Sequence, residues 1–70
     1  MIEMNIGIIG GSDGLGKTLC YYLRDEFNVY ISGRDHQKGR NVADMLNINY
    51  IESNTELAQI SDVLIVSVPI

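Results

Sequence analysis

The sequence has few of the residues that small proteins use for covalent or metal cross-links. One cysteine, Cys20, excludes an internal disulfide, and one histidine, His36, leaves no cluster for a structural zinc ion. Basic residues are also scarce: five Lys and Arg stand against nine Asp and Glu, which argues against a nucleic-acid-binding surface. The longest apolar run, Val63–Val68, is too short to span a bilayer, and the acidic Glu3 is atypical of a signal peptide. We therefore expect a cytoplasmic protein with no nucleic-acid or membrane partner.

What the sequence does contain is an alternation of short apolar runs with segments of helical periodicity. The first run, Met4–Ile9, ends in two glycines, and Leu15, Leu19 and Leu23 then recur every four residues, as on one face of a helix. The last run, 62–68, is apolar on both faces, which is typical of a strand inside a parallel sheet. The expected strands are 4–9, 28–32, 49–51 and 62–68, and the expected helices are 14–27, 35–47 and 53–60.

Two of these helices begin with residues that favour helix starts. Asp35 can cap the second helix, which would turn Val42 and Ala43 toward the core. Ser53 and Glu56 match the capping box, in which a serine is followed three residues later by a glutamate.

Strands that alternate with helices predict a parallel sheet with right-handed crossovers. At 70 residues the chain has room for one domain. We predict an α/β fold of Rossmann type, a partial βαβαβαβ sheet with strand order 3-2-1-4. Another doubly wound fold, such as the flavodoxin type, would give the same alternation, so the pattern alone does not identify a ligand.

A glycine-rich segment at residues 10–16, called the glycine loop below, lies between the first strand and the first helix. Glycines in this context let a phosphate approach backbone N–H groups at the positive end of a helix. The segment fits two spacings. From Gly11 it is G-x-G-x-x-G with Asp13 at the middle glycine, and from Gly10 it is G-x-x-x-G-x-G, the spacing of short-chain dehydrogenases. A tight turn with no ligand is the alternative.

The end of the second strand selects the cofactor in a Rossmann fold: an acid there binds the ribose of NAD, and an arginine accommodates the 2′-phosphate of NADP. Here Gly33 stands at the acid's position and Arg34 follows, 18 residues beyond Gly16, where the motif expects an interval of about 20. Lys38 adds a second positive charge nearby. We therefore predict NADP rather than NAD. The alternative is that Arg34 is a solvated turn residue that binds no ligand.

The remaining polar residues form no predicted catalytic centre. The sequence contains no paired carboxylates, no nucleophile with a neighbouring base and no metal-ligand spacing. Cys20 is expected to be a packed helix residue, and His36 a solvated residue near the adenosine pocket. We predict neither a catalytic residue nor a metal ligand in this chain.

Three segments together resemble the N-terminus of archaeal-type prephenate dehydrogenases. They are I-G-G-x-x-G-L-G-K at 9–17, S-G-R-D at 32–35, and D-V-x-I-x-S-V-P at 62–69. The last segment is shared with enzymes related to 6-phosphogluconate dehydrogenase and with deazaflavin-dependent NADP oxidoreductases. The resemblance covers almost the whole chain, and Asp13 is the departure from its pattern.

The resemblance implies a cofactor role for three groups of residues. The loop from Gly11 to Leu15 would hold the pyrophosphate, and Gly33 and Arg34 the adenosine ribose. Ser67, Val68 and Pro69 would line the path to the nicotinamide ribose. The residues expected to bind the cofactor are therefore Gly11, Ser12, Asp13, Gly14, Leu15, Gly33, Arg34, Lys38, Ser67, Val68 and Pro69.

The resemblance also implies a reaction, the oxidative decarboxylation of prephenate to 4-hydroxyphenylpyruvate in tyrosine biosynthesis. Family members carry their catalytic histidine and substrate-binding arginines beyond the segment matched here, so we expect residues 1–70 to be a dinucleotide-binding fragment that is inactive alone. The alternatives are the cofactor domain of a short-chain or deazaflavin-dependent enzyme, or a non-catalytic nucleotide-binding module. The fourth strand would leave an unpaired apolar edge, which predicts self-association.

Overall fold

The computed structural model describes residues 3–67, and the expected alternation of strands and helices is present there. The predicted last strand extends to Val68, which lies outside the described residues. In chain order the elements are β1 (Asn5–Ile9), α1 (Gly14–Leu23), β2 (Asn28–Ser32), α2 (His36–Leu46), β3 (Asn49–Tyr50), α3 (Asn54–Ile60) and β4 (Val63–Val66).

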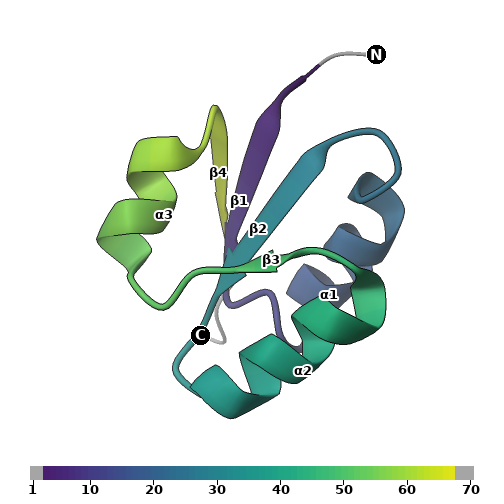
Figure 1. The fold of residues 1–70 in the computed structure, drawn as a ribbon, viewed down its shortest axis with the longest axis vertical. Coiled ribbons are helices and arrows are strands. Elements are labelled where there is room, and N and C mark those ends of the chain that lie inside the picture. Colours follow the sequence, from purple (N-terminus) through teal and green to yellow (C-terminus); the bar gives the residue numbers. More distant parts are fainter. Residues whose placement is uncertain (1–2, 68–70) are drawn as a thin grey trace.

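The strands form one parallel sheet in the order β3-β2-β1-β4 (Figure 1). This order confirms the predicted Rossmann-type topology and excludes the flavodoxin type, in which β1 would lie between β2 and β3. Asn5 pairs with Asn28 and Ile9 with Ser32, so β1 and β2 end at the same level. The chain winds from β1 out to β3 and then returns to place β4 beside β1. Such a reversal opens a crevice at the carboxyl ends of the strands, where α/β proteins bind ligands.

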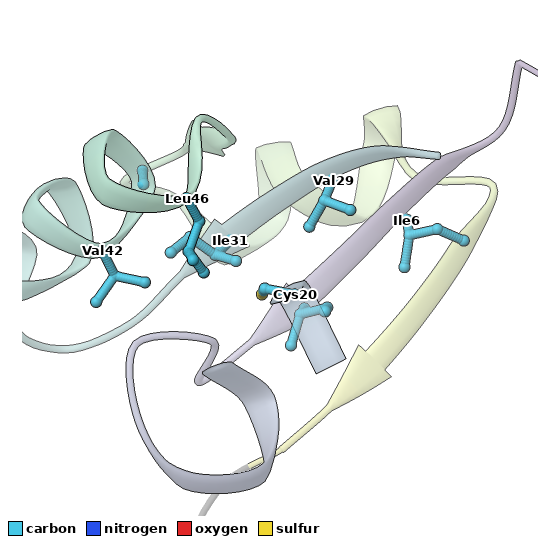
Figure 2. Close-up of a cluster of buried hydrophobic side chains, with 8 residues drawn as sticks. Ile6, Cys20, Val29, Ile31, Val42 and Leu46 are labelled. Atoms are coloured by element: carbon cyan, nitrogen blue, oxygen red, sulfur yellow. The ribbon is translucent and has the colours of Figure 1, made fainter. Parts of the chain in front are cut away.

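Helices cover both faces of the sheet (Figure 1). On one face α1 and α2 contact each other, and Cys20 and Leu46 from these helices pack in one cluster with Ile31 of β2. On the other face lies α3, because a β-carbon added to Gly7 of β1 would meet Leu57. Figure 2 shows the first cluster, in which side chains from the strands and both helices converge. Its members are Ile6, Ile8, Cys20, Val29, Ile31, Val42, Ala43 and Leu46.

The predicted caps are present at two helix starts. The Asp35 carboxylate accepts a hydrogen bond from the backbone N–H of Lys38 at 3.0 Å, and the Ser53 hydroxyl accepts one from the N–H of Glu56 at 3.2 Å. Each satisfies an N–H group that the first turn of a helix leaves without a partner. The first helix ends at Leu23 rather than at residue 27, and a turn continues from there to β2.

The structure corrects two expectations about burial. Among the described residues β4 pairs with β1 alone, which confirms the predicted edge, but its faces are not buried: Val63 and Leu64 are 42% and 41% exposed. An apolar run has the same sequence whether or not a further layer of structure covers it, which is why the expectation of burial on both faces is wrong. Leu15 was expected to share an apolar helix face with Leu19 and Leu23, yet it is 68% exposed because it lies in the first turn of α1, at the wall of a cavity.

Candidate functional site

The glycine loop makes a tight turn in which two glycines adopt left-handed backbone angles. Gly10 has φ of 84° and Gly14 has φ of 52°, a region that side chains disfavour. Gly16 packs directly on the loop, since a β-carbon there would lie 2.6 Å from the carbonyl oxygen of Gly10. The N–H of Gly10 donates to the Ser32 carbonyl at 2.8 Å, which ties the loop to the end of β2. The left-handed backbone angles therefore fall on Gly10 and Gly14, two glycines of the G-x-x-x-G-x-G spacing.

The glycine loop places the N-terminus of α1, which has no side-chain cap, at the carboxyl end of the sheet. Asp13 occupies the N-cap position of α1, and its side chain makes no capping hydrogen bond. The first N–H groups of a helix have no partner within the helix, and they carry the positive end of its dipole. Without a capping side chain, these donors are available to an anion, which fits a phosphate group.

The underside of the loop is packed on the core. A β-carbon on Gly11 would lie 2.5 Å from the Cγ2 atom of Ile31 and 3.4 Å from the sulfur of Cys20. Cys20 is fully buried, and burial raises the pKa of its thiol to about 11, opposed in part by a backbone hydrogen bond. The thiol is therefore protonated at neutral pH and acts as a packing residue, as expected from its place in the helix.

The site has two walls: the glycine loop is the first, and the turn from β2 into α2 is the second. Gly33 has room for a side chain, because an added β-carbon would meet only the hydroxyl of Ser12, at 3.4 Å. Arg34 and Lys38 follow, and both line the same cavity as the glycine loop. The Lys38 ammonium lies 2.5 Å from a carboxylate oxygen of Asp13, so an ion pair joins α2 to the loop. The structure thus brings together the loop residues and the basic residues that the sequence predicted to act together.

A tyrosine that the sequence analysis did not single out supports this turn. The hydroxyl of Tyr50, at the end of β3, lies 3.4 Å from the Gly33 carbonyl oxygen and contacts Nδ1 of His36. Its ring lies against Gly39 of α2, where a β-carbon would come within 2.2 Å. Burial raises the pKa of Tyr50, with Arg40 opposing and Asp35 adding to the effect. The sequence offered one indication of this contact: the predicted parallel pairing of β2 with β3 brings the ends of these strands together.

Loop and turn line an open cavity of about 1110 Å³ at the carboxyl ends of β1, β2 and β4. Ser67 lies at its β4 side, where its N–H donates to the Ile9 carbonyl at 2.8 Å. Asn54 at the start of α3, another residue the sequence did not indicate, lines the cavity and accepts a hydrogen bond from Ser32. Val68 and Pro69, the other predicted residues of this side, lie outside the described residues.

The described part of the chain, residues 3–67, contains no group of three or more His, Cys, Asp or Glu side chains that could hold a metal ion. Within the same residues no helix has the length and apolar character needed to cross a membrane. The charged side chains on the cavity wall are Asp13, Arg34, Asp35, Lys38 and Glu52. Of these, Arg34 and Lys38 are the cations with which an anionic ligand could pair, and Lys38 is itself paired with Asp13.

Comparison with known proteins bears out the predicted fold and the family resemblance. Residues 5–70 match the family described as NADP oxidoreductase, coenzyme F420-dependent. A probable arogenate/prephenate dehydrogenase of Methanocaldococcus jannaschii is 47% identical over 69 residues, which make up 97% of this chain and 16% of that protein. Among solved structures, UDP-N-acetylglucosamine 3-dehydrogenase GnnA from Acidithiobacillus ferrooxidans matches with a TM-score of 0.85 at 21% identity, over 99% of this chain and 22% of GnnA.

These matches differ in what they establish. At 21% identity the solved structure supports the fold alone. The chain spans 16% of the length of the M. jannaschii relative, so the likeness concerns one part of that protein. The family match extends across both walls of the cavity, from β1 to the end of the chain.

Proposed function

Since this chain belongs to the family of coenzyme F420-dependent NADP oxidoreductases and has their dinucleotide-binding Rossmann domain, we propose that it is the NADP-binding portion of a prephenate dehydrogenase-like oxidoreductase. The main support for the proposal is that the N-terminus of α1, which has no side-chain cap, and the basic residues Arg34 and Lys38 line one cavity. A cytoplasmic location is part of the same proposal.

The glycine loop would hold the pyrophosphate of the dinucleotide. Its backbone can approach a phosphate closely, because nothing lies within 4 Å of the position that a β-carbon on Gly14 would occupy. The free N–H groups at the start of α1 supply donors, and the helix dipole adds favourable electrostatics. Ser12 lies beside Gly33 and would contact the phosphate or the adjoining ribose. Bound NADP supplies the hydride-accepting nicotinamide, for which the Ser67 side of the cavity is the candidate location.

The turn after β2 would select NADP over NAD. Arg34 can pair with the 2′-phosphate through two N–H groups, and Lys38 adds a second cation. An acidic residue for the ribose hydroxyls of NAD is missing at Gly33. Calorimetric titration of the chain with NADPH and NADH tests this choice: NADPH should bind more tightly, and Arg34→Gln should remove most of the difference. Tighter binding of NADH by the wild-type chain would overturn the assignment of Arg34.

The proposed reaction is the oxidative decarboxylation of prephenate, and its support is the 47% identity to a protein named as a probable arogenate/prephenate dehydrogenase. The chain spans 16% of that relative, so we propose that the catalytic groups belong to a further part of a longer enzyme. The test is to express the longest open reading frame that contains this sequence and to assay it with prephenate and NADP. NADPH formation that depends on prephenate is expected, whereas cofactor binding without turnover of prephenate would reject the substrate.

A second candidate is suggested by the family description, which names coenzyme F420. In that case the same cavity would bind NADP, and the reaction would be hydride exchange with a deazaflavin. Reduction of NADP by reduced coenzyme F420, with no reaction of prephenate, would favour this candidate. Binding of NADPH with neither reaction would favour a non-catalytic nucleotide-binding module.

A further inference from the structure

The ion pair between Asp13 and Lys38 joins the two walls of the cavity. Asp13 belongs to the glycine loop and Lys38 to the first turn of α2, and the carboxylate and ammonium groups lie 2.5 Å apart. Both residues line the cavity proposed for the dinucleotide. The pair therefore uses one of the two cations that the proposed function assigns to the cofactor.

The position of Asp13 makes this pairing unusual. An aspartate at the N-cap of a helix ordinarily accepts a hydrogen bond from the first turn of that helix. Here the carboxylate makes no such bond and is instead paired with Lys38 of the neighbouring helix. The other acid nearby, Asp35, accepts from the backbone N–H of Lys38 and caps α2. The acid that faces the ammonium group is thus Asp13.

We propose that Asp13 reduces the preference for NADP over NAD by competing with the 2′-phosphate of NADP for Lys38, an inference that rests on the proposed function. The carboxylate has to release Lys38 before a phosphate can pair with it. NAD brings no 2′-phosphate to Lys38, so this competition weakens the binding of NADP more than that of NAD. Asp13 thereby narrows the preference that Arg34 and Lys38 create.

The size of the effect follows from exposure. The Lys38 and Asp13 side chains are 46% and 70% exposed, so solvent screens their attraction. The release of an exposed ion pair corresponds to a change in affinity of about threefold to fivefold. Salt weakens such a pair further, so the effect of removing Asp13 should shrink as the ionic strength rises.

The test compares ligands that differ only in the 2′-phosphate. Asp13→Asn removes the charge and keeps the shape, and calorimetry would measure its affinity for 2′,5′-ADP and 5′-AMP, and for NADPH and NADH. The variant should bind 2′,5′-ADP and NADPH about threefold to fivefold more tightly and change the other two affinities by less than about twofold. Asp25→Asn is the matched control, because Asp25 is an exposed acid beyond the far end of α1. Its affinities should equal those of the wild type.

A double-mutant cycle identifies the partner. In a Lys38→Met background, Asp13→Asn should no longer tighten the binding of 2′,5′-ADP, because the competition is for Lys38. Equal tightening of all four ligands, or a gain that persists without Lys38, would show that Asp13 acts on the shared phosphates and would overturn the proposal. Weaker binding by Asp13→Asn would overturn the proposal as well, since the Asp13 carboxylate would then stabilise the binding site. Asp13→Ser repeats the test if the asparagine variant misfolds.

The outcomes separate this inference from the proposed function. If the wild-type chain binds NADPH and Asp13→Asn leaves the affinities unchanged, the competition is rejected and the proposed function stands. If the wild-type chain binds none of the four ligands, both fail.

Discussion

A β-carbon on Gly16 would lie 2.6 Å from the carbonyl oxygen of Gly10 and 3.0 Å from the Cα atom of Gly11. The first turn of α1 therefore rests on the backbone of the loop that precedes it. The neighbouring Gly14 differs: it has φ of 52° and no atom within 4 Å of an added β-carbon. The two glycines serve different needs, close packing at one and a left-handed turn at the other.

This contrast predicts different responses to substitution. Gly16→Ala should lower the free energy of unfolding by about 1–3 kcal/mol, the cost of overpacking, and should abolish tight NADPH binding because the loop has to shift. Gly14→Asn should lower it by less than about 1 kcal/mol, since asparagine tolerates the left-handed region. Urea denaturation of both variants measures the difference. Equal stability of the two variants would contradict the packing argument.

The room at Gly33 predicts a change of cofactor preference. An aspartate fits there, because its β-carbon would meet only the Ser12 hydroxyl, at 3.4 Å. Gly33→Asp should weaken NADPH binding by about tenfold, or 1.4 kcal/mol, through repulsion of the 2′-phosphate, and it should strengthen NADH binding through the ribose hydroxyls. Gly33→Ala is the control and should change neither affinity appreciably. If the alanine variant loses both cofactors, the site is closed to any side chain and the argument from space is wrong.

Cys20 gives a prediction about pH. Its thiol has an ordinary pKa of 9.0 and a folded-state pKa of about 11, because burial disfavours the thiolate. Between these values the folded chain keeps a proton that the unfolded chain loses, so the free energy of unfolding should fall as pH rises from 9 to 11. Denaturation curves of wild type and Cys20→Ala across this range isolate the contribution as a difference in slope. Identical slopes would mean that the thiol ionises equally well in the folded state.

The exposed edge of β4 predicts self-association. Leu64 and Val66 are 41% and 62% exposed on a strand that pairs with β1 alone among the described residues, and such an edge can pair with a second copy. Sedimentation equilibrium should show a mass that rises with concentration. Leu64→Lys should reduce it, while Ala58→Lys on the exposed side of α3 should not. A monomeric mass at all concentrations would reject self-association.

The fold was predictable from sequence because local and long-range signals agreed. The apolar run before the glycines, the caps at Asp35 and Ser53, and the alternation of strands and helices each specify the same element order. The burial of β4 and Leu15 was not predictable in the same way. Their exposure depends on which layers cover them, and an apolar side chain has the same identity in a core and at an edge.

The site was predictable where the chain itself carries the signal. The glycine spacing and the interval to Arg34 indicate a loop and a turn that face one cavity, as found. The support of the turn by Tyr50 depends on contacts across the sheet, and so does the pairing of Asp13 with Lys38. Such contacts join residues far apart in sequence, so no local pattern of residue types predicts them.

The central claim, that a dinucleotide binds between the glycine loop and the turn after β2, is tested most directly by nuclear magnetic resonance. A ¹H–¹⁵N correlation spectrum of the labelled chain would be followed during titration with NADP. The account predicts that the largest saturable shifts fall on the amides of residues 10–16 and 33–38. Saturable shifts confined to α3 and β3, or no shifts at millimolar NADP, would contradict it.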